Sequence, residues 1–547
     1  VEFCCATDED RKLHVCVLLQ LAHCVPAVVV DQAYTVSGRI ILPLSAISEP
    51  FKAYVDNANQ LYRIDFYDGE MKVVVVNRTM YYDTWRPNKT THKPERVCRR
   101  IGDDDIIRAL PNLEQFKFVD RERCDSGSTA FVDELSECNH YEHKKPFVDA
   151  VTTRQFWTST TTDGHFVPVR YAESRISSLT DSTMDKTEIL YTNFTPGPID
   201  PAAFKTPDGD CTITDVEPVD GSEIVNPLIE LIHGDDSHMQ AHFKRFKTLY
   251  RRKYANPVEE ELRRYNFHHN LRFIHSMNRR NLSYALKVTH QTDWSADEFE
   301  RLAHCWRPSN ITSNVPSREQ PALDGPSQPL PQHVDWRLEG AVTPVKNQGT
   351  CGSCWSFGFV GSLEGAYFLQ KGKNEKVVSF SEQQLVDCAD ANGCNGGSFT
   401  EAYAYVKNYG LLTDTAYGPY RAIEGKCKDL ELKVRKVIPT LKNFVKVSTE
   451  KELLEALAHI GPVSAAINTA PRSFSFYSHG VYSDPHCRPV ALPDHAVVVV
   501  GYGLLDDEPY WLIKNSWSTH WGDGGYMLIS RRNDTCGVPN QAMYFEL

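Results

Sequence analysis

The sequence has no uninterrupted apolar run near the length of about 20 residues that a membrane-spanning helix needs. Basic residues are also scarce relative to acidic ones, since 59 Lys and Arg face 71 Asp and Glu and leave a net charge of −12. Nucleic-acid binding requires a basic face that displaces counterions, so this balance argues against a nucleic acid as partner. The chain of 547 residues is too long for one ordinary core, and roughly two or three domains are expected.

Residues 31–205 lack the sequence signatures of catalysis. They contain no cluster of His, Cys and Asp at metal-ligand spacing, no glycine-rich phosphate loop and no nucleophile elbow. Short runs of Val, Ile, Tyr and Thr alternate with polar residues instead, as in "YTVSGRIILPL" at 34–44, and Asp68-Gly69 is a typical hairpin turn. This half is expected to be a β-rich domain, a sandwich or barrel. No metal or cofactor is expected anywhere in the chain.

The chain has 16 cysteines, which points to the secretory route, where disulfides persist. Residues 1–30 hold the candidate signal peptide, because the apolar run 13–30 follows Arg11 and Lys12; a buried strand is the alternative. The cysteines expected to form disulfides rather than bind a metal in the first half are Cys98, Cys124, Cys138 and Cys211. Glycosylation is expected at the Asn-x-Ser/Thr sites Asn77, Asn88, Asn193, Asn281, Asn310 and Asn533.

Two stretches without core-forming patterns divide the rest of the chain. Residues 206–236 are acidic and rich in turn residues, so they are expected to be a linker. Residues 307–330 are rich in proline and small polar residues, and are expected to be an exposed activation linker that proteases cut. Residues 331–547 return to a globular composition.

Residues 237–306, between these linkers, are expected to be helical. Charged and apolar residues recur at helical spacing from His242 to about Met277, and Pro257 is expected in the first turn of a second helix. Six residues of that helix fall on one stripe, and Glu260 and Arg264 are spaced to pair one turn apart. The stripe consists of Glu260, Arg264, Phe267, Asn270, Ile274 and Asn278.

The segment "NQGTCGSCWSF" at 347–357 places Cys351 and Cys354 three residues apart. This spacing fits a redox pair, a zinc half-site, or one disulfide cysteine beside one reactive thiol. The apolar, glycine-containing sequence that follows predicts a buried helix opened by Ser353 or Cys354. Unpaired N–H groups and the dipole at a helix N-terminus stabilise a thiolate, so Cys354 is a candidate nucleophile.

His495 and Asn515 are the candidates for its partners. His495 heads the apolar strand in "LPDHAVVVVGYG", and Asn515 ends another strand in "YWLIKNSWS", with Trp517 placed to shield it. A base beside the thiol, and a side-chain amide that fixes the orientation of the imidazole, would complete an activated nucleophile. A lone histidine before a strand, or a lone asparagine after one, is more often structural, so the hypothesis depends on their combination.

Four segments of residues 331–547 together resemble the papain family of cysteine proteases. They are "VDWRLEGAVTPVKNQGTCGSCWSF", "GCNGG", "DHAVVVVGYG" and "KNSWSTHWGDGGYMLI". The resemblance implies that Cys354 is the nucleophile, His495 the general base and acid, and Asn515 the orienting residue. Gln348 and the backbone N–H of Cys354 would form the oxyanion hole. The implied fold class is α+β: a two-lobed papain-like domain, with a helical lobe and a β-barrel lobe, preceded by a helical inhibitory propeptide and a β-rich N-terminal domain.

The resemblance also implies a substrate cleft. The bare backbone at Gly396 and Gly397 would pair with a substrate as an added strand. A pocket for the second residue before the scissile bond is expected to prefer apolar or aromatic side chains. The residues implied for this pocket are Phe399, Ala466, Pro493 and Gln541, and those implied for the rest of the cleft are Asp494 and Trp521.

The same resemblance implies the pairing of the domain's cysteines. The implied disulfides are Cys351–Cys394, Cys388–Cys427 and Cys487–Cys536. Cys354 is then the unpaired cysteine of this domain. This pairing argues against the redox and zinc interpretations of the Cys351 and Cys354 spacing.

The helical stripe resembles the propeptide of cathepsin L-like rather than cathepsin B-like enzymes, which implies an intramolecular inhibitor. Of the short motif that usually follows in those enzymes, "KVTHQTD" at 287–293 keeps only Asp293. No histidine-bearing insertion of a carboxydipeptidase is evident. An endopeptidase acting on peptides and proteins is therefore favoured.

The order of the three parts resembles that of two-subunit cathepsin L-like proteinases of insect haemocytes. It implies a cleaved N-terminal domain that remains associated with the protease, in a lysosome, in a secretory granule or outside the cell. Three alternatives stay open. The β-rich domain could block the cleft, as in a dipeptidyl peptidase I-like exopeptidase, or it could bind a partner of its own. A non-enzymatic binding protein on a protease scaffold is disfavoured by the intact Cys354, His495 and Asn515.

Overall fold

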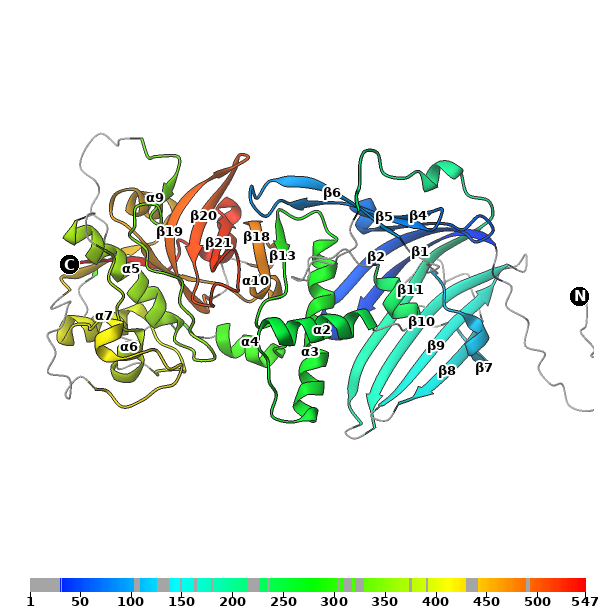
Figure 1. Ribbon diagram of the computed structural model, residues 1–547, viewed down its shortest axis with the longest axis horizontal. Coiled ribbons are helices and arrows are strands. Elements are labelled where there is room, and N and C mark those ends of the chain that lie inside the picture. Colours follow the sequence, from blue (N-terminus) through cyan, green and yellow to red (C-terminus); the bar gives the residue numbers. More distant parts are fainter. Residues whose placement is uncertain are drawn as a thin grey trace, which may run out of the picture.

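The computed structural model describes most of the chain (Figure 1). The described residues are 30, 32–102, 109–124, 137–147, 150–161, 165–178, 181–213, 226–233, 237–303, 305–307, 317–319, 329–372, 376–389, 392–428, 441–487 and 492–547. The predicted signal peptide except Val30, parts of the two predicted linkers, and Asn310 lie outside these ranges. Within them, no helix has the length and apolar character needed to cross a membrane.

A sheet of 12 strands forms the N-terminal part of the molecule, in the order β12-β6-β5-β4-β3-β2-β1-β11-β10-β9-β8-β7. The strands are β1 (Ala33–Leu42), β2 (Ile47–Asp56), β3 (Leu61–Phe66), β4 (Met71–Val76), β5 (Thr79–Pro87), β6 (Pro94–Gly102), β7 (Lys117–Glu122), β8 (Cys138–Pro146), β9 (Ala150–Thr160), β10 (Phe166–Ser177), β11 (Thr183–Pro196) and β12 (Thr212–Ile213). Figure 1 shows how strongly this sheet curves. The predicted hairpin is confirmed, because β3 and β4 pair antiparallel across Asp68 (φ 57°) and Gly69 (φ 95°).

The described strands of this domain form one continuous sheet with two open edges, so the prediction of a sandwich or barrel is wrong. Alternation along a strand tells which side chains face inward, but not which strands become neighbours. The inward face holds an aromatic core in which Phe51 and Phe156 both contact the Tyr191 ring edge-on. Helix α1 (Pro227–His233) adds Leu228 and Leu231 to this core. Disulfides join Cys98 to Cys211 and Cys124 to Cys138.

The segment after the sheet is helical, as predicted. It contains α2 (Ser237–Leu249), α3 (Pro257–Asn278), strand β13 (Tyr284–Leu286) and α4 (Ala296–Ala303). The side chain of Asn256 accepts a hydrogen bond from the N–H of Glu259 and caps α3. Pro257 occupies the first turn, where its missing N–H costs no hydrogen bond.

The six residues of the predicted stripe on α3 fall into two groups, the last four and the first two. Its last four residues are buried and hold the propeptide together: Asn278 binds both the N–H and the C=O of Leu286, and Asn270 donates to the C=O of Thr292.

The predicted pair between Glu260 and Arg264 is wrong. Glu260 instead contacts Lys247 of α2, and Arg264 contacts Glu261, because α2 lies close enough to α3 to supply a competing cation.

Residues 329–547 form two lobes. The helical lobe contains α5 (Cys354–Lys371), α6 (Glu382–Cys388), α7 (Phe399–Tyr409) and α8 (Asp414–Tyr417). The second lobe is built on β15 (Val334–Asp335), β16 (Asn443–Val447), β17 (Val463–Ile467), β18 (Tyr477–Tyr482), β19 (His495–Leu505), β20 (Glu508–Lys514), β21 (Tyr526–Ser530) and β22 (Ala542–Glu546), with α9 (Glu450–His459) and α10 (Arg472–Ser475). Strands from residues before 331 extend both edges of this sheet: β13 of the propeptide pairs with β18, and β14 (Ser317–Glu319) of the segment after the propeptide pairs with β16.

Helix α3 lies between the N-terminal sheet and the second lobe (Figure 1). On the sheet side, Arg279 forms a bidentate ion pair with Glu49, and Arg272 contacts Asp185 and Glu230. Arg279 and Glu49 are almost completely inaccessible to solvent. The N-terminal domain is therefore held to the propeptide by buried ion pairs.

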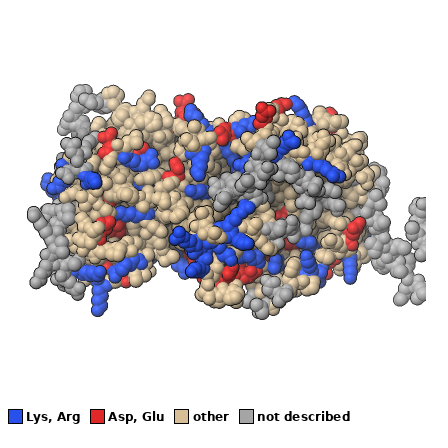
Figure 2. Space-filling model, in the orientation of Figure 1, with Lys and Arg blue, Asp and Glu red and all other residues tan. Residues whose placement is uncertain are grey.

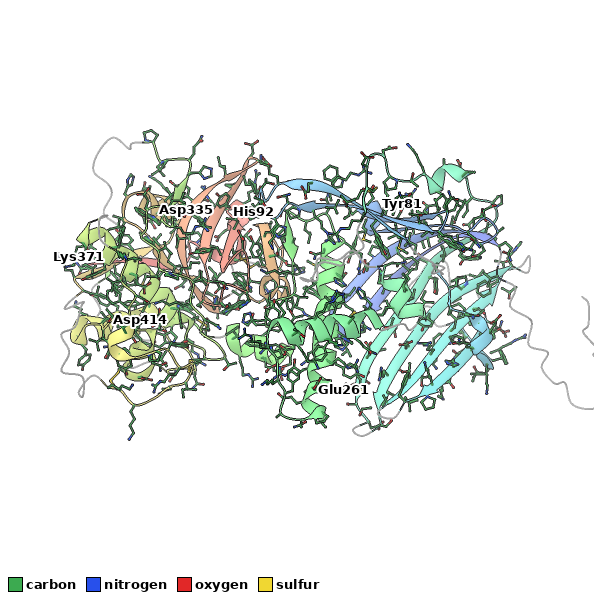
Figure 3. All side chains as sticks on the ribbon, viewed as in Figure 1. Tyr81, His92, Glu261, Asp335, Lys371 and Asp414 are labelled. Carbon is green, nitrogen blue, oxygen red and sulfur yellow. A yellow bond between two sulfur atoms is a disulfide. The ribbon has the colours of Figure 1, made fainter. Side chains whose placement is uncertain are left out.

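The β5–β6 hairpin makes a second contact, directly with the second lobe. Lys93 pairs with Asp506, and the N–H of Gly480 donates to His92. Figure 3 labels His92 at this boundary. On the face shown in Figure 2, acidic and basic side chains are interspersed over both halves of the molecule.

Replacing Arg279 by methionine is expected to destabilise the docked N-terminal domain by about 3–5 kcal/mol, because Glu49 would remain as a buried charge without its partner. Calorimetry of the full chain should show the corresponding transition at lower temperature. The matched control is Arg532→Met, since the Arg532–Glu508 pair is solvent-exposed and is expected to contribute at most about 1 kcal/mol. Equal shifts in the two variants would contradict the role given to the buried pair.

Candidate active site

Cys354 is the first residue of α5, and Ser353 is its N-cap, as predicted. The cysteine is fully buried between the two lobes. Its place at the helix N-terminus puts the sulfur near unpaired backbone N–H groups and the positive end of the helix dipole, which favour a thiolate whenever the thiol is free.

His495 and Asn515 come from neighbouring strands of the second lobe. His495 opens β19, Asn515 follows the end of β20, and Nε2 of His495 lies 2.8 Å from Oδ1 of Asn515. The N–H of Ser516 donates to the same oxygen, so this oxygen must accept from His495 Nε2–H. Nδ1 of the imidazole is left out of this bond and lies 3.4 Å from the sulfur of Cys305. Burial lowers the pKa of His495 to about 4, so the ring is neutral near pH 7 in this form.

The loop before α5 brings Gln348 to the same place. Its Oε1 accepts from the Ser516 hydroxyl at 2.7 Å, and its Nε2 donates to the C=O of Cys351 at 3.0 Å. Tyr420 fixes the loop further by donating to the C=O of Gln348. These bonds hold the amide of Gln348 with its Nε2 3.9 Å from the sulfur of Cys305.

The sulfur of Cys354 is bonded to Cys305, which follows α4 of the propeptide. The prediction that Cys354 is unpaired is therefore wrong for this form of the chain. The prediction considered only the cysteines of residues 331–547, and the partner lies 49 residues earlier in the sequence. Cys351 does not pair with Cys354, because it is bonded to Cys394.

The propeptide residues around Cys305 lie on the backbone of the cleft. The N–H groups of Cys305 and Trp306 both donate to the C=O of Asp494, at 3.1 and 3.0 Å. Gly397 donates to the C=O of Cys305 and accepts from the N–H of Arg307, so the segment pairs with Gly397 as a short parallel bridge. Gly396 has φ +104°, and a side chain there would crowd the C=O of Cys305. The backbone predicted to bind a substrate strand thus binds the propeptide.

Trp306 occupies the apolar side of the cleft. Its ring lies 6.3 Å from that of Phe399, and both belong to one buried cluster with Ala466. The N–H of Ala466 donates to the C=O of Gln541, whose side chain is exposed. Pro493 lines a cavity of about 890 Å³ next to Trp306. Phe399, Ala466 and Pro493 therefore lie near an aromatic side chain of the propeptide, whereas Gln541 is joined to them only through the backbone of Ala466.

Comparisons with known proteins agree with this geometry. Residues 330–546 match the model of the papain family cysteine protease, and residues 243–299 match that of the cathepsin propeptide inhibitor domain. Over 317 residues the chain is 40% identical to digestive cysteine proteinase 2 of Homarus americanus, and the match covers 55% of this chain and 93% of that protein. The chain belongs to the papain family of cysteine proteases.

Other members of the papain family match over the same region. Cathepsin S of Bos taurus is 39% identical over 331 residues, which are 58% of this chain and 95% of that protein. The solved structure of digestive procathepsin L 3 from the larval midgut of Tenebrio molitor superposes with a TM-score of 0.51 at 32% identity, covering 56% of this chain and 99% of that one. The chain is accordingly a cathepsin L-like cysteine peptidase in its zymogen form, with a β-rich region ahead of its propeptide.

Trp517 and Trp521 form an aromatic wall beside His495 in this papain-family site. The Trp517 ring lies 4.8 Å from the imidazole and 5.5 Å from Trp521. Trp521 was expected to line the cleft; here it is fully buried and donates to the C=O of Phe474. Its link to His495 is therefore made through the ring of Trp517.

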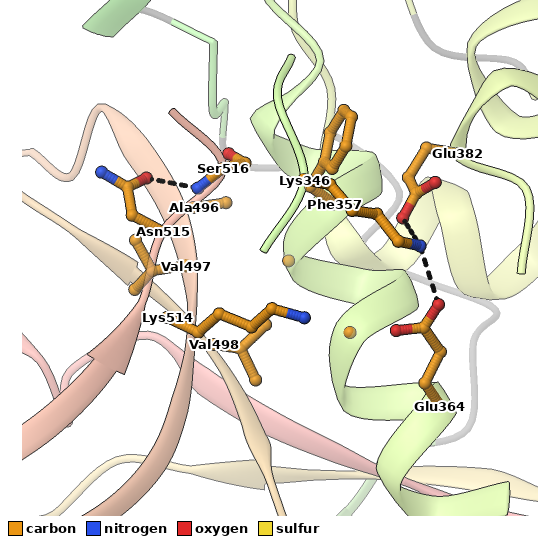
Figure 4. A pocket seen from close by; sticks show the side chains of 12 residues that line it. Lys346, Phe357, Glu364, Glu382, Ala496, Val497, Val498, Lys514, Asn515 and Ser516 are labelled. Carbon is orange, nitrogen blue, oxygen red and sulfur yellow. Dashed lines mark hydrogen bonds and ion pairs between the residues drawn. The ribbon is translucent and has the colours of Figure 1, made fainter. Parts of the chain in front are cut away.

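A buried charge cluster behind the site was not anticipated from the sequence. Lys346 lies between Glu364 and Glu382, and Lys514 approaches from β20 (Figure 4). Burial and the nearby Glu364 raise the pKa of Glu382 to about 7, while burial lowers the pKa of Lys514 to about 8. Lys346 precedes Gln348 by two residues, and Lys514 directly precedes Asn515, so the cluster fixes the two segments that carry Gln348 and Asn515 against α5. The sequence feature that could have indicated this charge cluster is the presence of single charged residues within apolar runs.

The remaining predicted positions are structural or lie on the surface. The structure contains the disulfides Cys388–Cys427 and Cys487–Cys536. All 12 described cysteines are paired, and Cys4, Cys5, Cys16 and Cys24 lie outside the described residues. The described sequon asparagines that are exposed or half-buried are Asn77, Asn88, Asn193, Asn281 and Asn533.

Docking of the propeptide is expected to depend on pH through His290. Burial, with Arg252 and His520 nearby, lowers its pKa to about 3. In a released propeptide the pKa of His290 returns to its ordinary value near 6.5, so this residue does not affect docking above that pH. As the pH falls from about 6.5 toward 3, docking loses up to about 1.4 kcal/mol per pH unit from this residue, because only the released form takes up the proton.

Replacing His290 by glutamine is therefore expected to move acid-induced loosening of the propeptide to lower pH. Hydrogen exchange of β13 would report it, in a Cys354→Ala background that can neither cleave itself nor bond to Cys305. The control is His165→Gln, since His165 is exposed on the N-terminal domain. The same pH profile in both variants would contradict the prediction.

Proposed function

We propose that the chain is the zymogen of an endopeptidase in which Cys354 attacks the scissile carbonyl, His495 is the general base and acid, and Asn515 orients the imidazole. The hydrogen bond from His495 to Asn515 carries this proposal, because it leaves Nδ1 directed at the cysteine. The Nδ1 and sulfur atoms of the group Cys305, Cys354 and His495 lie within 4.8 Å of one another.

The reaction follows from these positions once Cys354 is free and the propeptide has left. The proton of the thiol passes to His495, and the thiolate attacks the carbonyl carbon. Gln348 Nε2–H and the N–H of Cys354 donate to the oxyanion. His495 then protonates the leaving amine, and a water molecule that it deprotonates hydrolyses the thioester. The thiolate also stabilises the imidazolium that is disfavoured in the present form.

The domain division that we propose follows the expected boundaries: a signal region (1–30), a β-rich domain (31–205), an acidic linker (206–236), an inhibitory propeptide (237–306), an activation linker (307–330) and the peptidase domain (331–547). The expected linker 206–236 also contributes strand β12 and helix α1 to the β-rich domain, so only part of it connects the domains. The propeptide is the inhibitor because its residues Cys305 and Trp306 are hydrogen-bonded to the backbone of the cleft. The β-rich domain remains associated after cleavage through Lys93 and His92. Disulfides and surface sequons are consistent with a lysosomal, granular or extracellular location.

Endopeptidase activity is favoured over dipeptidyl peptidase activity because the segment in the cleft belongs to the removable propeptide. Among the described residues, it is 305–307 rather than the N-terminal sheet that form hydrogen bonds to the backbone of Gly397 and to the C=O of Asp494. Trp306, packed against Phe399, further supports a pocket that prefers aromatic or apolar side chains in the second residue before the scissile bond.

The test is hydrolysis of three peptides by the activated enzyme under reducing conditions. The first has a blocked amino terminus and Phe at the second position before the scissile bond, the second has Gly there instead, and the third is a dipeptide substrate with a free amino terminus. The blocked Phe peptide is expected to be cleaved efficiently and the Gly peptide poorly. Cleavage of the free-terminus substrate alone would contradict the proposal and favour the exopeptidase.

A further inference from the structure

Cys305 is held in the active site by its backbone as well as by its sulfur. Its N–H donates to Asp494 and its C=O accepts from Gly397, so both lobes of the cleft fix its position. Its Cα lies 5.7 Å from that of Cys354, inside the range of roughly 4.4–6.8 Å that disulfides require. The docked propeptide therefore presents this cysteine to the nucleophile at bonding distance, and the pairing needs no movement of the backbone.

The sulfur of Cys305 lies where a substrate carbonyl would have to react. It is 3.4 Å from Nδ1 of His495 and 3.9 Å from Nε2 of Gln348, the groups that would serve proton transfer and the oxyanion. The bond thus has two effects at once. It removes the electron pair with which Cys354 would attack, and it fills the space between the nucleophile and the oxyanion donors.

We propose that a disulfide between Cys305 and Cys354, which we call the propeptide disulfide, keeps the zymogen inactive by blocking the nucleophile. Activation then requires a thiol reductant that breaks this bond. Acid and proteolysis of the linkers alone would leave the propeptide residues around Cys305 attached to Cys354. The inference rests on the proposed role of Cys354. It adds a redox requirement that the non-covalent contacts of a propeptide do not impose.

The chemistry is thiol–disulfide exchange with a dithiol reductant. One thiolate of the reductant attacks Sγ of Cys305, the Cys305–Cys354 bond breaks, and Cys354 leaves as a thiolate that the N-terminus of α5 stabilises. The second thiol of the reductant then attacks the mixed disulfide and releases Cys305. Overall, two electrons and two protons pass from the reductant to the cysteine pair, and the reductant becomes a disulfide.

Zinc binding is the main competing use of these residues. Among the described residues, Cys305, Cys354 and His495 form the group whose donor atoms are close enough to hold a metal ion. A structural zinc site normally has four protein ligands, and this group supplies three. The disulfide is favoured because the other 10 described cysteines are also paired, which indicates that the chain folds where thiols are oxidised.

The test uses the full-length zymogen, purified without reductant and denatured in an alkylating reagent that blocks free thiols. Mass spectrometry of the digested protein is expected to find the peptide carrying Cys305 linked to the one carrying Cys354, with both cysteines unalkylated. Alkylation of both would overturn the proposal. So would release of stoichiometric zinc from the undigested zymogen with both thiols free.

A second measurement follows reactivity. Wild-type zymogen, loosened at acid pH, is expected to be labelled at Cys354 by a thiol-reactive epoxide only after treatment with a dithiol, whereas Cys305→Ser is labelled without it. The double variant Cys124→Ser, Cys138→Ser removes a disulfide of the N-terminal domain and should behave like wild type. A dithiol requirement that persists in Cys305→Ser would overturn the proposal. Because peptide mapping needs no activity, an inactive enzyme after reduction and propeptide removal would contradict the proposed function without affecting the bond.

Discussion

Cys354→Ala is expected to reduce kcat for the blocked Phe peptide on the order of 10⁶-fold, because the methyl group cannot attack a carbonyl and only binding and the oxyanion donors remain. The assay compares activated enzymes, free of propeptide and reduced. Cys354 is fully buried at the start of α5, and alanine differs from it only by the loss of the sulfur atom.

The control for this variant is Cys305→Ser. It also lacks the propeptide disulfide, but it retains the nucleophile and leaves the mature domain unchanged. Full activity is expected once its propeptide is removed. If Cys354→Ala hydrolysed the peptide as fast as Cys305→Ser, another residue would have to be the nucleophile.

Gln348→Ala is expected to lower kcat on the order of 10²–10³-fold with little change in KM, since the lost N–H donor acts on the oxyanion rather than on the bound substrate. Gln348→Glu keeps the size of the side chain and the acceptor for Ser516 but has no N–H donor, so a comparable loss is expected. Steady-state kinetics on the blocked Phe peptide would measure both.

The control here is Gln370→Ala, because Gln370 is exposed on α5, far along the helix from Cys354. Its kcat should match wild type. A melting curve separates catalysis from folding, since Gln348 is buried and bonded to Ser516. Wild-type kcat in Gln348→Glu would contradict the oxyanion role.

The parts of the site that could be predicted from sequence are those fixed by local signals. Ser353 and the apolar run after it place Cys354 at a helix N-terminus, and the apolar runs around His495 and Asn515 place them at strand ends. Asn256 and Pro257 likewise mark the start of α3. Such features depend on residues a few positions apart, which a single sequence displays directly.

The features that could not be predicted from the sequence depend on contacts between segments that are far apart in the chain. Glu260 pairs with Lys247 because α2 and α3 meet, and no spacing within α3 could indicate it. The curved 12-stranded sheet depends on which strands become neighbours, and alternation does not encode that choice. Cys305 was missed for the same reason, since counting cysteines within the peptidase domain leaves out a partner that the propeptide supplies.

The most direct measurement is to locate the adduct of an epoxide thiol inhibitor in the reduced, propeptide-free enzyme by mass spectrometry while following peptide hydrolysis. The predicted result is an adduct on Cys354 and loss of activity in proportion to its formation. Hydrolysis that continues when Cys354 is fully modified would contradict the assignment of this residue as the nucleophile.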